Sequence, residues 1–333
     1  MGEKILLVGT GALATLFAAR LSEAGHSIQM LGTWKHGLQA LKENGARLVD
    51  ATGNERAYPV HTADDPREFT GTKHALVLVK SWQTERAARQ LKECLAEDGL
   101  ALTLQNGLGN REILQKYLDV REGVQRLPTL DAAEVRPARS ARGASQRLRT
   151  PDLPRVALGT TTTGATLLGP GLVRAGGEGV ISIERNQVIG PLEDALRSAD
   201  FNVQMVDDAQ SLIWGKLVIN AAINPLTALL QVPNGALLER PAAREVMGAL
   251  ARETAEVAKA ERVHLPFSNP VHAAEEVARK TAANHSSMFQ DVRRGAPTEI
   301  DAICGAVTRR GKKHGIPTPF NHACWKLVQA VQR

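Results

Sequence analysis

The sequence predicts an α/β protein: an N-terminal Rossmann-type, doubly wound parallel sheet followed by a C-terminal, all-helical domain. Up to residue 206, short apolar runs alternate with helical segments, which is typical of parallel strands connected by helices. From Asp207 the pattern changes to long amphipathic segments with no clear strand. We therefore expect a sheet domain over residues 1–206 and a helical domain over residues 207–333.

The elements of the N-terminal domain follow one another regularly. The expected strands are short and apolar, as buried parallel strands are, and cover residues 5–8, 27–31, 75–79, 100–104 and 156–159. Helices are expected over residues 13–24, 35–44 and 84–95. The first two stop before Gly25 and Gly45, because glycine readily adopts the conformation that ends a helix.

Residues 119–155 do not fit this alternation. They contain eight arginines and five acidic residues and are rich in Ala, Pro and Ser. A compact domain rarely needs so long a connection. We expect an Arg-rich surface insertion, and a regulatory or partner-binding role for it stays open.

The composition excludes several classes of protein. Hydrophobic residues make up 43% of the 333 and charged residues 23%, which is typical of a soluble globular protein. No apolar run approaches the roughly 18 uninterrupted residues of a membrane span, and no signal peptide precedes the first strand. Three widely spaced cysteines fit free thiols in a reducing compartment. We expect a cytoplasmic protein with no membrane partner.

The net charge of +6 does not indicate a nucleic-acid partner. Aromatic residues make up only 4% and are not interleaved with the arginines, so a platform for stacking bases is absent. A basic surface also steers anionic cofactors and substrates inward. The nine histidines show no metal-ligand spacing, so we expect no metal.

A glycine-rich motif follows the first expected strand: Gly9, Thr10, Gly11, Ala12, Leu13 and Ala14. In such a motif Gly9 permits a tight turn, Gly11 lets the backbone approach a pyrophosphate, and Ala14 allows close packing of helix on strand. The following helix presents free N–H groups to the phosphates. The motif predicts dinucleotide binding, with a turn that needs glycine for packing alone as the alternative.

The end of the second strand indicates which dinucleotide is bound. An NAD site usually carries an acid there for the ribose 2′-hydroxyl, and residues 30–35 contain none. Thr33 can donate a hydrogen bond to a 2′-phosphate, and Lys35 can supply charge. We therefore predict NADPH (NADP+) as the cofactor, although both residues would also suit an ordinary loop.

Polar residues at two strand ends are candidates for ligand contacts, because open α/β sheets bind ligands there. Lys80 follows one strand and would meet a phosphate or ribose. Asn106 follows the next and would hydrogen-bond cofactor or substrate. For Asn106 the alternative is a turn, because it precedes Gly107.

The apolar segment 213–230 carries Lys216, Asn220 and Asn224 at four-residue intervals, which places them on one stripe of a buried helix. Buried polar groups are costly without partners, so the stripe indicates a site. Pro225 should kink or end the helix, and Asn234 follows in a turn that could return to the stripe. In the alternative, Lys216 reaches solvent and the asparagines link helices.

A last polar cluster includes Asn284, Ser287 and Glu299. Asn and Ser side chains can hold a substrate carboxylate without adding charge. We place Glu299 in the first turn of a helix capped by Thr298, where its alternative role is support of the cap. Asp291 is expected either to be structural or to support residues that contact the ligands.

These motifs together resemble the ketopantoate reductase (2-dehydropantoate 2-reductase) family over nearly the whole chain apart from residues 119–155. The most specific parts are Trp214-x-Lys216-Leu-x-x-Asn220-x-x-x-Asn224-Pro and Ser286-Ser-Met-x-Gln-Asp291. The resemblance implies NADPH-dependent reduction of 2-dehydropantoate to pantoate, in pantothenate and coenzyme A biosynthesis. Two features depart from the family: Thr33 stands where some members carry Arg for the 2′-phosphate, and the insertion is long.

The resemblance also implies roles for individual residues. Lys216 would donate the proton, and Asn220 would hold the carbonyl oxygen or the lysine in line. Substrate contacts are implied for Asn106, Lys216, Asn220, Asn224, Asn234, Asn284 and Ser287. Cofactor contacts are implied for the Gly9–Ala14 loop, Lys80, Asn106, Ala165 and Glu299.

Two other functions stay open: reduction of another small 2-keto or 3-keto acid, and a non-catalytic NADP(H)-binding sensor. The expected partner is the small keto-acid substrate. A homodimer also stays open.

Overall fold

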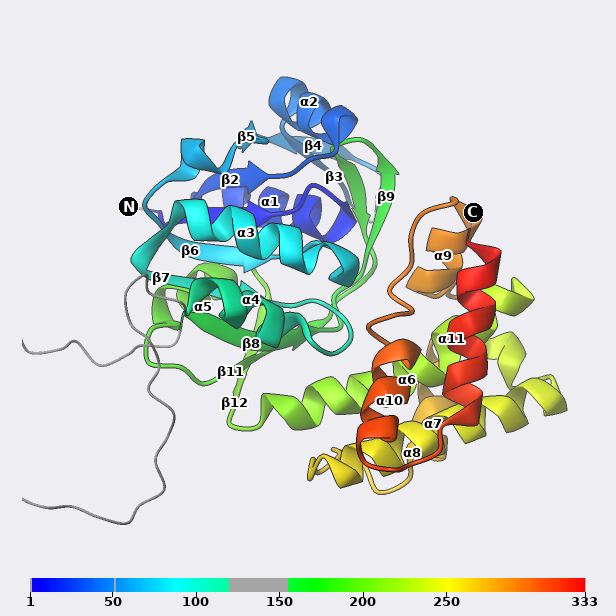
Figure 1. The fold of residues 1–333 in the computed structure, drawn as a ribbon. Helices are drawn as coiled ribbons and strands as arrows, with labels where there is room; N and C mark the ends of the chain where they lie inside the picture. Colours follow the sequence, from blue (N-terminus) through cyan, green and yellow to red (C-terminus); the bar gives the residue numbers. More distant parts are fainter. Residues whose placement is uncertain (1, 51, 120–154, 333) are drawn as a thin grey trace, which may run out of the picture.

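A computed structural model describes residues 2–50, 52–119 and 155–332 (Figure 1). The predicted insertion lies outside the described residues except for its two ends, Asp119 and Arg155. The described strands all lie before residue 207, and six α-helices make up the part of the chain described beyond that point. The predicted fold class, a doubly wound sheet followed by a helical domain, is confirmed.

The main sheet has eight strands in the order β12-β11-β8-β7-β6-β1-β2-β5. The strands are β1 (Lys4–Val8), β2 (Ser27–Leu31), β5 (His61–Ala63), β6 (Thr72–Val77), β7 (Leu95–Thr103), β8 (Val156–Thr161), β11 (Val180–Glu184) and β12 (Asn202–Val206). All neighbours pair in parallel except β11 with β8. The five predicted strands are present, with β6 and β7 beginning earlier than expected.

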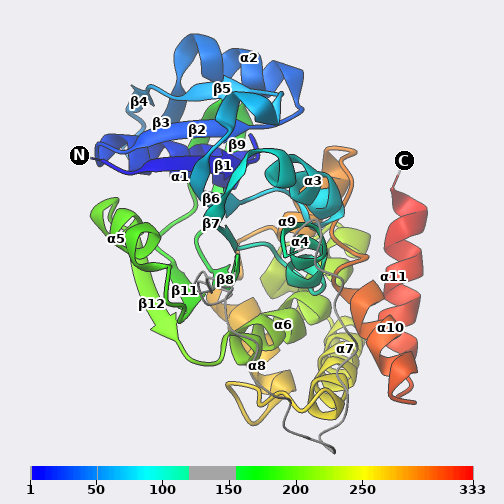
Figure 2. The same ribbon diagram turned by 60° about the vertical axis from the view of Figure 1, so that its left-hand side comes forward.

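Helices cover both faces of this sheet (Figures 1 and 2). They are α1 (Ala12–Glu23), α2 (Lys35–Asn44), α3 (Thr84–Cys94), α4 (Asn110–Leu118) and α5 (Gly190–Ser198), with short 3₁₀ turns η1 (Pro66–Phe69) and η2 (Ser81–Gln83). Strand β1 is buried on both sides: Leu7 packs in one core with Phe17 of α1, and Leu6 packs in another with Leu91 of α3. Burial on both faces explains why β1 is a continuous apolar run.

A second sheet was not predicted. It has the order β4-β3-β10-β9 and consists of β3 (Ala46–Val49), β4 (Glu55–Tyr58), β9 (Ala165–Gly169) and β10 (Leu172–Ala175). It packs against α1. These strands are four or five residues long and partly exposed, so they lack the continuous apolar run that identified the others.

The C-terminal helices surround one long central helix, α6 (Ala209–Leu230), as Figure 1 shows. The others are η3 (Asn234–Leu237), α7 (Pro241–Ala260), α8 (Pro270–Lys280), α9 (Ser287–Arg293), α10 (Cys304–Lys313) and α11 (Pro319–Val331). Buried residues of α6 such as Trp214 and Leu217 share a core with Met247 of α7 and Val328 of α11. This core holds α6 from several sides.

Helix α6 does not end at Pro225 but continues to Leu230, so an end at the proline is wrong. Pro225 has no backbone N–H to donate. Close to it in the helix, the Thr227 hydroxyl donates to the backbone oxygens of Ile223 and Asn224, both at 3.0 Å. By length and composition α6 is apolar enough to cross a membrane. However, 72% of its apolar window is buried inside the protein, as in the core helix of a soluble protein.

The helix predicted at Glu299 is also wrong. Helix α10 begins at Cys304, and Glu299 lies in the turn before it, where its backbone oxygen accepts from the N–H groups of Ala302 and Ile303. This turn contacts the loop after β7, since Leu108 N donates to Ala302 O at 3.0 Å. Glu299 therefore lies where the two domains meet.

Candidate active site

The glycine motif lies where the strand order of the main sheet reverses. From β1 the chain continues outward to β2 and β5 on one side and later returns to β6 on the other. Open α/β sheets bind ligands at such a switch point. Gly9 has φ +135°, and a Cβ there would lie 3.3 Å from the Leu78 backbone after β6. A side chain at Gly9 would therefore be both strained and crowded.

The start of α1 fits a pyrophosphate. Gly11 caps the helix without any side-chain hydrogen bond, and no acidic residue lies in the first turn. A Cβ placed on Gly11 would meet no atom of the described chain within 4 Å, so the space above it is open. The positive end of the helix dipole and the free N–H groups of this turn suit an anion.

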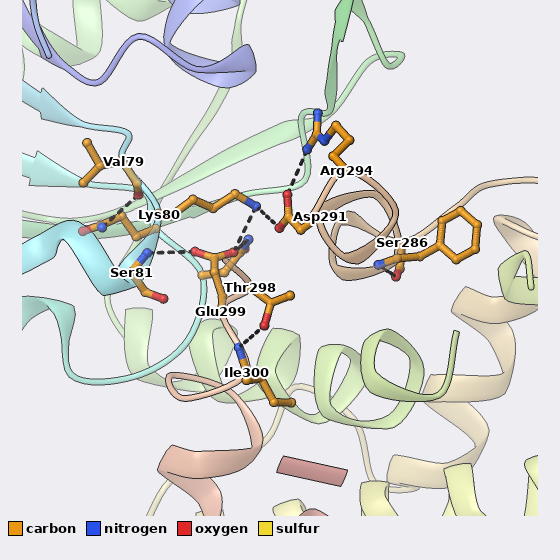
Figure 3. Close-up of polar contacts among 12 residues, drawn as sticks. Val79, Lys80, Ser81, Ser286, Asp291, Arg294, Thr298, Glu299 and Ile300 are labelled. Carbon is orange, nitrogen blue, oxygen red and sulfur yellow. Dashed lines mark hydrogen bonds and ion pairs between the residues drawn. The ribbon is translucent and has the colours of Figure 1, made fainter. Parts of the chain in front are cut away.

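Lys80 and Glu299, two of the predicted cofactor contacts, lie together (Figure 3). A third, Asn106, is hydrogen-bonded to Glu299. Lys80 Nζ lies 3.8 Å from Glu299 Oε2, and Asn106 Nδ2 donates to the same oxygen at 3.0 Å. The other carboxylate oxygen accepts from Ser81 N at 3.0 Å. Glu299 is only 5% exposed. The carboxyl ends of β6 and β7 are thus joined through one buried carboxylate from the helical domain.

Asp291 of α9 completes this cluster. Its Oδ2 lies 2.7 Å from Lys80 Nζ, and its Oδ1 accepts from Arg294 at 2.9 Å. Asp291 is 2% exposed, and a carboxylate so deeply buried is stable only with charged or hydrogen-bonding partners. Sequence reasoning gave Asp291 a structural or supporting role but did not identify Lys80 as its partner. Nothing in the local pattern relates two positions 211 residues apart.

Lys216 is partly exposed, but its ammonium is held within the protein. Its Nζ donates to the backbone oxygen of Thr161, at the end of β8, at 2.6 Å. Burial lowers the pKa of Lys216 to about 8, and the negative charge of Glu299 opposes part of this shift. Glu299 therefore acts on Lys216 as well as on Lys80 and Asn106. The alternative in which this lysine reaches bulk water does not hold.

The two asparagines of the α6 stripe have no side-chain hydrogen bond within the described part of the chain. Asn224 is only 7% exposed, whereas Asn220 is partly exposed. The alternative in which these amides link neighbouring helices is thus not observed. A buried amide without a partner is costly, which is typical of a group reserved for a ligand.

Asn234 and Asn284 lie next to each other. Asn234 N donates to Asn284 O at 2.9 Å, and Asn234 Nδ2 donates to the Thr281 hydroxyl at 2.9 Å. Asn234 Oδ1 is buried without a partner among the described residues. Ser287, the first residue of α9, is exposed, and its neighbour Ser286 caps that helix.

The remaining predicted contacts lie at the edges of the sheet domain. Ala165 begins β9, four residues after the carbonyl that binds Lys216. Lys35 is the exposed first residue of α2. Thr33 is exposed, and its hydroxyl accepts a hydrogen bond from Arg86 at 2.6 Å. Sequence reasoning missed Arg86, because it lies within the regular amphipathic pattern of α3.

Two family models match the chain. The model described as "Ketopantoate reductase PanE/ApbA" matches residues 5–187, and "Ketopantoate reductase PanE/ApbA C terminal" matches residues 208–332. The chain belongs to the ketopantoate reductase family. The predicted resemblance is confirmed, and membership supports a nicotinamide cofactor and a small keto-acid substrate.

Individual relatives extend over the full chain. The 2-dehydropantoate 2-reductase of Halobacterium salinarum is 32% identical over 336 residues, which covers 99% of each chain. A PanE/ApbA family ketopantoate reductase from Ralstonia eutropha has a crystal structure with a TM-score of 0.83, at 29% identity over 99% of this chain and 98% of that chain.

A third similar protein shows how widely the fold is used. D-mandelate dehydrogenase, solved with NADH and anilino(oxo)acetate, has a TM-score of 0.82 at 24% identity over 99% of this chain and 98% of that chain. At this identity the similarity concerns the fold alone. The fold therefore does not by itself decide between NADH and NADPH.

Proposed function

We propose that this ketopantoate reductase family member reduces 2-dehydropantoate to pantoate with NADPH, a step of pantothenate and coenzyme A biosynthesis. The observation that carries the proposal is the environment of Lys216: an ammonium with a pKa lowered to about 8, held by the Thr161 carbonyl and influenced by Glu299. Glu299 in turn contacts Asn106 at the end of β7. The name of the Halobacterium relative supports the substrate.

Lys216 supplies the proton in this proposal. Reduction of a ketone builds negative charge on the carbonyl oxygen, and a nearby ammonium stabilises this charge and then donates its proton. Burial makes the proton easier to release, while Glu299 keeps the lysine from losing it too early. Asn220, one turn further along α6, holds the carbonyl oxygen or the lysine in line.

The glycine loop and the ends of β6 and β7 hold the cofactor. Gly9 and Gly11 leave room for the pyrophosphate, and the first turn of α1 binds it. NADPH, when bound, supplies a hydride to the ketone carbon. Lys80, Asn106 and Glu299 are proposed to orient it. Lys80 already has two carboxylate neighbours, so it also positions Glu299.

Amide and hydroxyl groups bind the keto acid. Asn224 is a buried residue whose side chain makes no hydrogen bond within the described chain. Asn234 Oδ1 is buried without a partner among the described residues. Asn284 and Ser287 add exposed groups at the start of α9. Such uncharged groups bind a carboxylate or hydroxyl of the substrate and do not themselves neutralise the positive charge of the Lys216 ammonium.

We also propose a reducing, cytoplasmic location. Cys94, Cys304 and Cys324 are all buried and free. Burial raises the pKa of the Cys94 thiol to about 12, so the reactive thiolate is scarce at neutral pH. Unpaired cysteines of this kind are typical of a reducing compartment.

The test is oxidation of NADPH by purified protein with 2-dehydropantoate, beside NADH and a panel of other 2-keto and 3-keto acids. We expect the highest kcat/KM for the pair of NADPH and 2-dehydropantoate. A higher kcat/KM with another keto acid would identify that acid as the substrate, and the proposed reaction, reduction of a ketone, would stand. If the protein binds the cofactor but no keto acid causes the cofactor to be oxidised, the result would contradict an enzymatic function. It would favour the non-catalytic NADP(H)-binding sensor.

A further inference from the structure

Arg86 extends from α3 to the end of β2. Its NH1 donates to the Thr33 hydroxyl at 2.6 Å, two residues beyond the last residue of the strand. This is the one hydrogen bond that the Arg86 side chain makes within the described chain, although a guanidinium has five donors. Arg86 Nε is buried and has no partner among the described residues. Apart from the bond to Thr33, the terminal NH1 and NH2 groups make no hydrogen bond within the described chain, so they are the donors available to a ligand.

Arg86 also lacks a neutralising carboxylate. Burial lowers the pKa of this guanidinium, and no acidic group opposes the shift. Arg89, one turn further along the same helix, is different, because it pairs with Glu85 at 2.7 Å. Asp64, which follows the neighbouring strand β5, forms no ion pair with Arg86 in the described chain. A partly buried, unpaired cation favours an anionic ligand.

The end of β2 lies beside the glycine loop. Gly9 N donates to Leu31 O at 2.8 Å, and a Cβ on Gly32 would lie 2.6 Å from the Thr10 side chain. Thr33 thus follows directly on a backbone segment that touches the loop proposed to hold the pyrophosphate. In Rossmann-type sheets the adenosine ribose lies at this strand end.

The surroundings of Thr33 are positive as well. Helix α2 begins at Lys35 with no side-chain cap and no acidic residue in its first turn. The free N–H groups and the positive dipole end of this turn add to the charges of Lys35 and Arg86. An Asp or Glu that would favour a ribose 2′-hydroxyl is absent from residues 30–35.

We propose that Arg86, supported by the Thr33 hydroxyl, recognises the 2′-phosphate of NADPH and determines the preference for NADPH over NADH. The proposal rests on the NADPH-dependent reduction proposed above. A guanidinium binds a phosphate with two parallel hydrogen bonds, which one ammonium at Lys35 does not provide. Thr33 accepts from Arg86 and keeps its own O–H for the phosphate.

The experiment measures binding of 2′,5′-ADP and of 5′-ADP by calorimetry, so it does not depend on turnover. In the wild type we expect 2′,5′-ADP to bind more tightly. Arg86→Gln should weaken 2′,5′-ADP by about 10-fold or more, the loss expected for a charge-assisted pair, and leave 5′-ADP within about two-fold. The control Arg89→Gln, which removes a surface arginine from the same helix, should change neither.

The outcomes separate this inference from the proposed function. Equal loss of both ligands in Arg86→Gln, or no loss of 2′,5′-ADP, would overturn the role of Arg86 while NADPH-dependent reduction could still be measured. A wild type that binds both nucleotides equally would overturn the NADPH preference and the role of Arg86 together. A third outcome is that Arg86→Gln loses affinity for 2′,5′-ADP alone while the wild type does not reduce 2-dehydropantoate. This result would support the role of Arg86 and contradict the proposed substrate.

Discussion

Lys216 carries two properties that a proton donor needs, a lowered pKa and a fixed position. Burial lowers the pKa to about 8, and the Thr161 carbonyl holds the ammonium at 2.6 Å. Glu299 opposes the effect of burial. The balance keeps Lys216 mostly protonated at neutral pH and able to release its proton.

This balance predicts the pH dependence of turnover. In the proposed mechanism the proton comes from protonated Lys216. We therefore expect kcat at saturating substrate and cofactor to be constant at low pH and to fall as the pH rises through about 8. Glu299→Gln removes a charge that raises this pKa, so the fall should begin at lower pH. The measurement is a kcat–pH profile of both proteins.

Asp301→Asn is the control for this profile. Asp301 is near Glu299 in sequence but binds Trp325 Nε1 at 2.8 Å, and no effect of it on Lys216 is found. It should leave the inflection in place. An inflection that stays near 8 or moves to higher pH in Glu299→Gln would contradict the role of Glu299.

Asn224 should contribute to substrate binding rather than to the stability of the folded protein. Its amide is 7% exposed and has no hydrogen-bond partner in the described chain. Asn224→Leu should therefore keep or raise the melting temperature, because leucine is apolar and a good helix former. The same change should raise the KM for 2-dehydropantoate about 10-fold or more. A clear loss of stability with an unchanged KM would make Asn224 a structural residue.

Several residues of the candidate site had a local signal in the sequence. The glycine motif followed a strand, and Lys216, Asn220 and Asn224 formed a polar stripe on an apolar helix. Arg86 and the pairing of Asp291 with Lys80 had no such signal. Their meaning depends on contacts across 53 and 211 residues, which no helix or strand period contains.

At the scale of elements, the pair of Lys80 and Asp291 connects the end of β6 to α9. Asp291 is almost fully buried, whereas the Lys80 side chain is 36% exposed. Solvent reaches one partner, so the pair is weaker than a fully buried one. It still joins an element of the sheet domain to an element of the helical domain.

Removal of Asp291 should destabilise the protein measurably. Asp291→Ala leaves Lys80 with Glu299 at 3.8 Å and removes the partner of Arg294. We expect a loss of about 1–3 kcal/mol in the free energy of unfolding, measured with urea. Asp98→Ala, which breaks the exposed pair with Lys73, should cost about 0.5 kcal/mol or less. Equal effects of the two changes would show that Asp291 is not an anchor.

Elements with strong periodicity were predictable, and weak or context-dependent ones were not. The apolar runs identified the central strands, but β3, β4, β9 and β10 are short and half-exposed. Pro225 was expected to kink or end α6, yet packing on several sides carries the helix on to Leu230. The Pro-Thr-Glu pattern before α10 imitates a helix start, but the chain forms a turn there.

At the scale of the whole molecule, Glu299 brings the two domains to one point. Its oxygens contact the ends of β6 and β7, and its charge acts on the lysine of α6. The candidate active site thus combines groups from both the sheet and the helices. Alternation of strands and helices predicted the fold class, whereas the domain boundary after residue 206 stays a prediction.

The most direct test measures both turnover and NADPH affinity in Lys216→Ala. The two values distinguish the loss of a proton donor from damage to the cofactor site. We expect kcat with 2-dehydropantoate to fall by about 100-fold or more, while the Kd of NADPH, followed by its fluorescence, stays within about two-fold. Lys313→Ala, which removes an exposed lysine of α10, should match the wild type in both. Near-normal turnover by Lys216→Ala, with NADPH bound normally, would contradict the assignment of Lys216 as the proton donor.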